Sequence, residues 1–159
     1  MKVNTLISNV MTIVLTVFMT SCGSQPASEG YAVPKSFHSQ QCYLTQGESY
    51  IWLEQEDEWL ALPAAIRQQM KSTAINWLAE NVFIVSMGQK PSAGYGIKLS
   101  NWLLEQHHWQ VTRITHDPEP GSLQAMMISS PCVLVKIPKT IKSFSLKNEQ
   151  DQVLGRWPY

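Results

Sequence analysis

The sequence predicts an α+β, predominantly β domain, a small antiparallel sheet or sandwich-like domain with one or two N-terminal helices. Apolar residues recur at helical spacing before Asn81, whereas after it they form short runs or alternate with polar residues, as strands do. Turn-forming residues separate these runs. Hydrophobic residues make up 44% of the chain, which suffices for the core of a single domain.

The chain begins with a segment typical of a bacterial lipoprotein signal peptide. Lys2 supplies a positive start, and the apolar stretch Val10–Met19 leads through Thr20 and Ser21 to Cys22. This stretch is shorter than the roughly 20 apolar residues that span a bilayer. We therefore expect residues 1–21 to be removed and Cys22 to be lipidated. An ordinary secretory signal and an uncleaved anchor are the alternatives.

Lipidation of Cys22 would place the protein in the cell envelope. Each buried methylene of an acyl chain contributes roughly 0.8 kcal/mol, so several chains would make detachment from the membrane negligible. Gly23, rather than Asp, follows the cysteine. This resembles lipoproteins sent on to the outer membrane of Gram-negative bacteria, so we expect a location there, facing the periplasm.

The charge balance argues against a nucleic-acid partner. Removal of the signal peptide takes away Lys2 and no acid, which leaves 11 basic and 12 acidic side chains. No basic stripe exists that could hold phosphates. The partners expected are a protein, with a protease as the candidate, and the membrane through the lipid anchor.

Residues 22–39 are expected to form a flexible tether, because they are rich in Pro, Gly and Ser and lack apolar periodicity. A single globular domain is then expected over residues 40–159. Its two cysteines, Cys42 and Cys132, could form a disulfide in an oxidising periplasm. Their spacing does not decide between a bridge and two buried thiols.

The first part of the domain is expected to hold two strands and a helical region. Gln41–Leu44 and Ser49–Leu53 are strand-like, with Gly47 at the turn between them. Acids suited to a first helical turn follow at residues 56–58. Pro63 can begin a second helix, whose predicted apolar face consists of Ile66, Met70, Ala74 and Trp77.

The rest of the domain is expected to be β. Val82–Met87 is a continuous apolar run that ends before Gly88, which predicts a strand buried on both faces. Later segments alternate apolar and polar residues, which predicts one wetter face. The other predicted strands are Tyr95–Leu99, Trp109–Thr112, Leu123–Ile128, Val133–Ile137, Lys142–Leu146 and Gln152–Gly155, with a link through Leu103–His108 and a turn at Asn148.

Two loops, Gly88–Gly96 and His116–Ser122, carry most of the specific information. Prolines stiffen both, and Gly94 can adopt a positive φ. Ordinary turn chemistry is one interpretation. The other is a contact surface, because ordered loops on a rigid sheet lose little entropy when a partner docks. The predicted contact residues are Pro91, Ser92, Gly94, Tyr95, Pro118, Pro120, Gly121 and Trp157, with Tyr95 and Trp157 as aromatic anchors.

Four ordered motifs resemble a known family. They are Val82-Phe83-Ile84-Val85 with Gly88, Lys90-Pro91-Ser92-Ala93-Gly94-Tyr95, Pro118-Glu119-Pro120-Gly121, and Pro131-Cys132-Val133-Leu134-Val135-Lys136-Ile137-Pro138. Residues 75–139 thus resemble the C-terminal domain of the protease complex subunit PrcB. The family usually has Thr-Gly-Gly-Tyr at residues 92–95 and an aromatic residue at Cys132. The resemblance implies a lipoprotein that stabilises or assists a surface or periplasmic protease and is not itself a peptidase.

A second resemblance implies an alternative function. Residues 91–95 are similar to the Pro-Thr-Thr-Gly loop of chagasin-like cysteine-protease inhibitors, which sits on an immunoglobulin-like sandwich. Arg156-Trp157-Pro158 has the residues of that family's third loop in altered order. The glycine-rich second loop of the family is missing here.

The sequence offers little for catalysis, so we expect no enzyme, no catalytic residues, no cofactor and no metal. It lacks a helical His pair, a nucleophile elbow and a phosphate-cradling loop. The minor alternatives are a zinc or copper site at His108 and His116, a carbohydrate surface if Trp102 and Trp157 are both exposed, and a small hydrolase.

Overall fold

The computed structural model describes residues 33–69 and 74–158. The predicted signal peptide, Cys22 and most of the predicted tether lie outside these residues. Within the two described ranges, no helix has the length and apolar character needed to cross a bilayer.

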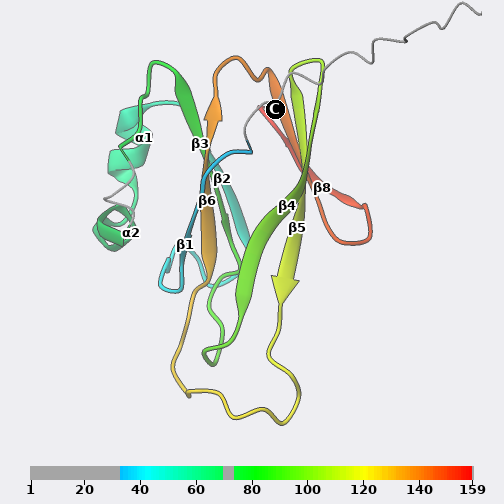
Figure 1. The fold of residues 1–159 in the computed structure, drawn as a ribbon. Helices are drawn as coiled ribbons and strands as arrows, with labels where there is room; N and C mark the ends of the chain where they lie inside the picture. Colours follow the sequence, from blue (N-terminus) through cyan, green and yellow to red (C-terminus); the bar gives the residue numbers. More distant parts are fainter. Residues whose placement is uncertain (1–32, 70–73, 159) are drawn as a thin grey trace, which may run out of the picture. The chain divides into compact units, whose positions relative to one another are not determined.

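The described residues form two four-stranded sheets that pack face to face (Figure 1). The first sheet has the order β1-β6-β3-β2 and the second the order β4-β5-β7-β8. All neighbours are antiparallel except β5 and β7, which are parallel. The predicted fold class is therefore confirmed. The elements are β1 (Ser36–Ser39), β2 (Ser49–Leu53), α1 (Glu56–Ala61), α2 (Ala64–Gln69), β3 (Glu80–Ser86), β4 (Gly96–Glu105), β5 (His108–His116), β6 (Cys132–Pro138), β7 (Ser143–Lys147) and β8 (Val153–Trp157).

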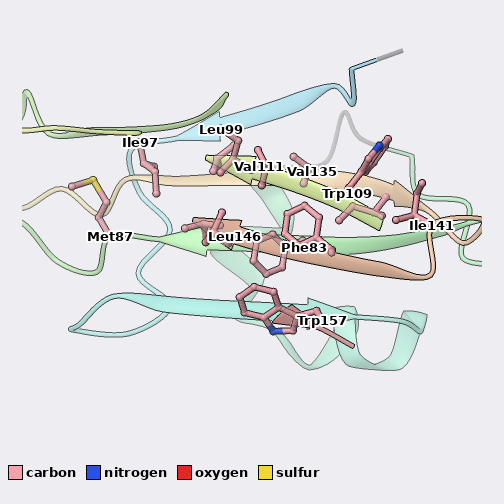
Figure 2. Close-up of a cluster of buried hydrophobic side chains, with 14 residues drawn as sticks. Phe83, Met87, Ile97, Leu99, Trp109, Val111, Val135, Ile141, Leu146 and Trp157 are labelled. Carbon is pink, nitrogen blue, oxygen red and sulfur yellow. The ribbon is translucent and has the colours of Figure 1, made fainter. Parts of the chain in front are cut away.

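Buried side chains from both sheets fill the space between them (Figure 2). Phe83 of β3 lies at the centre, with its ring centroid 4.7 Å from that of Phe144 and 4.6 Å from that of Trp157. Val111 of β5 and Val135 of β6 pack in the same cluster. Each large apolar side chain buried in this way contributes about 1.5–3 kcal/mol, so this cluster holds the two sheets together.

β3 is buried on both faces, as the continuous apolar run predicts. Phe83 and Val85 point between the sheets, whereas Val82 and Ile84 belong to a second cluster on the outer face of the first sheet. The helical region covers that outer face (Figure 1) and supplies Trp59 and other partly buried side chains to the second cluster.

The two helices are short, six residues each. The side chain of Glu58 accepts hydrogen bonds from the backbone amides of Glu54 (2.6 Å) and Gln55 (3.2 Å), which stabilises the start of α1. The predicted apolar face that extends to Trp77 is wrong at its C-terminal end, because residues 74–76 are not helical and Trp77 lies in a turn. There the Asn76 side chain accepts the amide of Leu78 (3.2 Å), a local bond that competes with helix formation.

The first predicted strand, Gln41–Leu44, is wrong. Only Gln41 makes an isolated bridge, to Ser130, and Tyr43 has a φ of 44°, which a strand does not accommodate. The strand in this part of the chain comes earlier. β1 covers Ser36–Ser39 and pairs with β6, so the folded domain begins inside the stretch that the sequence assigned to the tether.

Two later predictions also need correction. The link expected over Leu103–His108 is mostly strand, because β4 continues to Glu105 and only Gln106 and His107 form the turn into β5. Both turn residues have positive φ, 46° and 67°, as a two-residue hairpin with a type I′ turn requires. The strand expected over Leu123–Ile128 does not form, and this segment belongs to the long connection before β6. The turn at Asn148 is confirmed, with its side chain accepting the amides of Gln150 and Gln152.

Candidate functional site

Three connections meet at one end of the sandwich, the lower end in Figure 1. They are residues 40–48 between β1 and β2, residues 87–95 between β3 and β4, and residues 117–131 between β5 and β6. They meet because β1, β3 and β5 all run toward this end before the chain turns back. We call these three connections the loop end.

Backbone hydrogen bonds join the three connections directly. The amide of Gln89 donates to the carbonyl of Gln46 (2.9 Å), which links the first two connections. The amide of Ala93 donates to the carbonyl of Ala125 (3.0 Å), which links the second to the third. Ser129 adds a side-chain bond from its hydroxyl to the carbonyl of Ser92 (2.8 Å). The base of the loop end is therefore an ordered unit.

Two glycines allow this close packing. Gly88 has a φ of 71°, and a Cβ there would collide with the carbonyl oxygens of Gln46 and Gly47. Gly94 has a φ of 101°, and a Cβ there would collide with the Gln124 side chain. A side chain at either position would be both strained and obstructed.

The structure brings the two sequence-predicted loops together at the loop end. Pro91 and Gly94 are exposed in one loop, and Pro120 and Gly121 are exposed in the other. The half-buried predicted residues are Ser92, Tyr95 and Pro118. The Tyr95 ring packs against the main core, and the Lys90 Nζ atom lies 5.5 Å from its centroid. Contact with a partner stays a prediction for these residues.

Trp157 is not part of this site. It lies in β8 opposite Phe144, is only 2% exposed, and contacts Phe83 and Tyr50. Its side chain is almost wholly used in packing between the sheets, so its prediction as an aromatic anchor is wrong. Residues 156–157 belong to strand β8 and not to a loop, so they do not correspond to the third loop of the chagasin-like inhibitors.

The burial of Trp157 also argues against the alternative of a carbohydrate-binding surface. It requires both Trp102 and Trp157 to be exposed, and Trp157 is buried. Trp102 is half-buried, with its ring centroid 5.5 Å from that of Trp109. The two tryptophans therefore contribute to packing.

The most exposed apolar residues of the loop end were missed by the sequence reasoning. Leu123 and Met126 are 102% and 96% exposed, and Met127 and Ile128 are also exposed. The sequence placed all four in a strand. One signal against that strand was available, because residues 123–127 contain no β-branched or aromatic side chain.

A disulfide lies at the base of the loop end. It joins Cys42, just after β1, to Cys132, the first residue of β6, with the two Cα atoms 6.0 Å apart. Both residues are buried. The Cys42 amide also donates to the carbonyl of Ser130 (2.9 Å), and the Ser130 amide donates to the carbonyl of Gln40 (2.8 Å), so backbone hydrogen bonds join the first and third connections beside the disulfide.

The histidines do not form a metal site. His108 and His116 lie at opposite ends of β5, roughly 27 Å apart at about 3.4 Å per residue, so a shared zinc or copper ion is impossible. Among the described residues, no group of three or more His, Cys, Asp or Glu side chains could hold a metal ion. The His108 ring lies between the hydroxyls of Ser143 (2.6 Å) and Ser145 (2.9 Å), with no carboxylate bonded to it in the described part of the chain.

Two hollows lie away from the loop end. One has a volume of about 560 Å³ and is lined by Glu105, Gln106 and His108. The other, of about 390 Å³, lies between the edge strands β2 and β8 and includes Tyr50, Trp52 and Trp157 in its lining. Neither brings the loop residues into a concave site.

The chain was compared with models of protein families. Residues 82–138 match the model described as PrcB C-terminal. The match runs from β3 to the end of β6 and therefore includes the second and third connections of the loop end. No curated protein and no solved structure gives a significant match.

Proposed function

Because residues 82–138 carry a PrcB C-terminal domain, we propose that this protein is a non-catalytic, lipid-anchored accessory protein that stabilises a protease complex in the cell envelope. The family description supports an accessory role beside a protease. Binding through the loop end, anchoring at Cys22 and a location at the outer membrane are further parts of the proposal.

The observation that carries the proposed binding role is the exposed apolar segment Leu123–Ile128 on an ordered base. Exposed apolar groups gathered at one place are typical of interaction sites. The hydrogen bonds between the three connections hold this segment's surroundings in place, so docking would cost little further entropy.

Crosslinking and affinity capture from membranes, followed by mass spectrometry, test this proposal. The double variant Leu123→Ser/Met126→Ser removes two exposed apolar side chains from the loop end. Leu78→Ser is the matched control, because Leu78 is 94% exposed and lies in the turn before β3. We expect a peptidase to be recovered with the wild type and the control, and to be lost with the double variant.

Two results would contradict the proposal. Reproducible recovery of envelope-assembly factors without any peptidase would remove the protease connection. Equal recovery of the same partner by all three proteins would remove the role of the loop end.

A further inference from the structure

The backbone of the exposed segment Leu123–Ile128 is largely unbonded. Two of its carbonyl groups accept hydrogen bonds from described residues. The Ala125 carbonyl accepts hydrogen bonds from the amides of Ala93 and Met127, and the Ile128 carbonyl accepts one from the Tyr43 hydroxyl (3.0 Å). The amides of Leu123, Gln124, Ala125 and Met126 donate to no group in the described part of the chain. The segment is therefore attached to the β3–β4 connection at Ala125 and to the β1–β2 connection at Ile128, and its other backbone groups are open among the described residues.

The open amides and carbonyls of this segment indicate the conformation of a ligand that would bind to it. A run of open amides and carbonyls beside exposed apolar side chains is the arrangement that accepts an added β-strand. A helix satisfies its own backbone groups and would leave those of the segment unbonded. A bilayer would place the open amides in hydrocarbon, where each unsatisfied group costs several kcal/mol.

We propose that the segment Leu123–Ile128 binds an extended, apolar peptide segment of the protein partner by strand addition. This inference rests on the proposed function and specifies how the loop end binds. Backbone hydrogen bonds would supply the pairing, and Leu123, Met126, Met127 and Ile128 would contact the apolar side chains of the added strand.

The charges before the segment specify one end of the added strand. Asp117 and Glu119 are exposed in the same connection, and residues 114–135 contain no Lys or Arg. Lys90, the cation of the neighbouring connection, lies against the Tyr95 ring. Complementary charge favours association, so the partner's apolar segment carries Lys or Arg at the end that lies beside Asp117 and Glu119.

Three synthetic peptides test the inference on the mature protein in detergent. The first alternates Val and Thr over six residues and has two Lys at each end. The second has the same sequence with three consecutive central amides N-methylated, and the third has Glu in place of Lys. Binding is measured by titration, together with hydrogen exchange of the amides of residues 122–128.

We expect the first peptide to bind and to slow exchange of the segment's amides. N-methylation removes about two hydrogen bonds and should weaken binding about tenfold or more. The peptide with Glu should bind more weakly than the peptide with Lys. Leu123→Ser/Met126→Ser should weaken binding of the first peptide, whereas Leu78→Ser should not.

The inference would be overturned if the first peptide did not bind, if the N-methylated peptide bound equally well, or if exchange in residues 122–128 did not change. It would also be overturned if vesicles of anionic lipid, and not the peptides, protected these amides. Failure of the proposed function gives a different result in a different experiment. In the capture from membranes, the double variant Leu123→Ser/Met126→Ser would then recover the partner as well as the wild type does.

Discussion

Lys90 and Ser129 exchange two backbone hydrogen bonds, Lys90 N to Ser129 O (2.8 Å) and Ser129 N to Lys90 O (3.0 Å). This antiparallel pair joins the β3–β4 connection to the β5–β6 connection. It fixes the base of the loop end, while the segment at residues 123–128 extends beyond it with exposed side chains. The predictions below follow from this division between a fixed base and an exposed segment.

Gly94→Ala should destabilise the protein. Alanine at a φ of 101° is strained, and its Cβ would also meet the Gln124 side chain and lie 3.3 Å from the Cβ of Pro118. We expect a loss of about 1–3 kcal/mol, measured by urea unfolding. Gly47→Ala is the control, because a Cβ there meets nothing within 4 Å. Equal unfolding midpoints for the two variants would contradict this account of the loop.

Loss of the disulfide should also lower stability. The bridge between Cys42 and Cys132 closes a sequence separation of 90 residues, and such a bond contributes about 2–4 kcal/mol. Unfolding with and without a reductant measures this difference. Without reductant, a thiol-alkylating reagent should label neither cysteine in the unfolded protein, and labelling of both would show that the bridge is not formed.

Trp157→Ala should reduce the free energy of unfolding by about 3–5 kcal/mol, as expected for a large buried side chain. Val153→Ala, at an exposed position of the same strand, should change it by less than about 0.5 kcal/mol. The milder variant Trp157→Phe should still capture the partner from membranes. If a folded Trp157→Phe protein failed to recover the partner, Trp157 would be a binding residue after all.

Leu123→Ser/Met126→Ser should leave stability within about 0.5 kcal/mol of the wild type, because both side chains are fully exposed. Thermal and urea unfolding check this. A large loss of stability would mean that these side chains pack against the protein, and the loop end would then lack its exposed apolar segment.

Cys22→Ala should release the protein from membranes or misplace it, because the acyl chains would have no attachment site. Membrane fractionation and mass measurement of the processed N-terminus check this. Cys42→Ala is the control, since it removes a different cysteine and should leave membrane attachment intact. Unchanged retention of the Cys22→Ala protein would refute lipidation at this residue.

The sequence alone determined the fold class and most of the strands, because local periodicity depends on which faces are buried. The continuous apolar run at Val82–Met87 predicted a strand buried on both faces, and β3 has that burial. The turn at Asn148 was also predictable, because its side chain bonds to nearby backbone groups. The residues of both predicted loops were identifiable because Pro and Gly limit or widen the backbone conformations available at their own positions.

Only the tertiary structure decided which of these pieces meet. Trp157 and Leu123 are both apolar in sequence, yet one is enclosed between two sheets and the other is exposed. Ser36–Ser39 looks like a linker and becomes a strand because β6 offers it a partner, whereas Leu123–Ile128 looks like a strand and finds none in the described chain. Strand formation and burial depend on neighbours that are distant in the sequence, and local pattern cannot supply them.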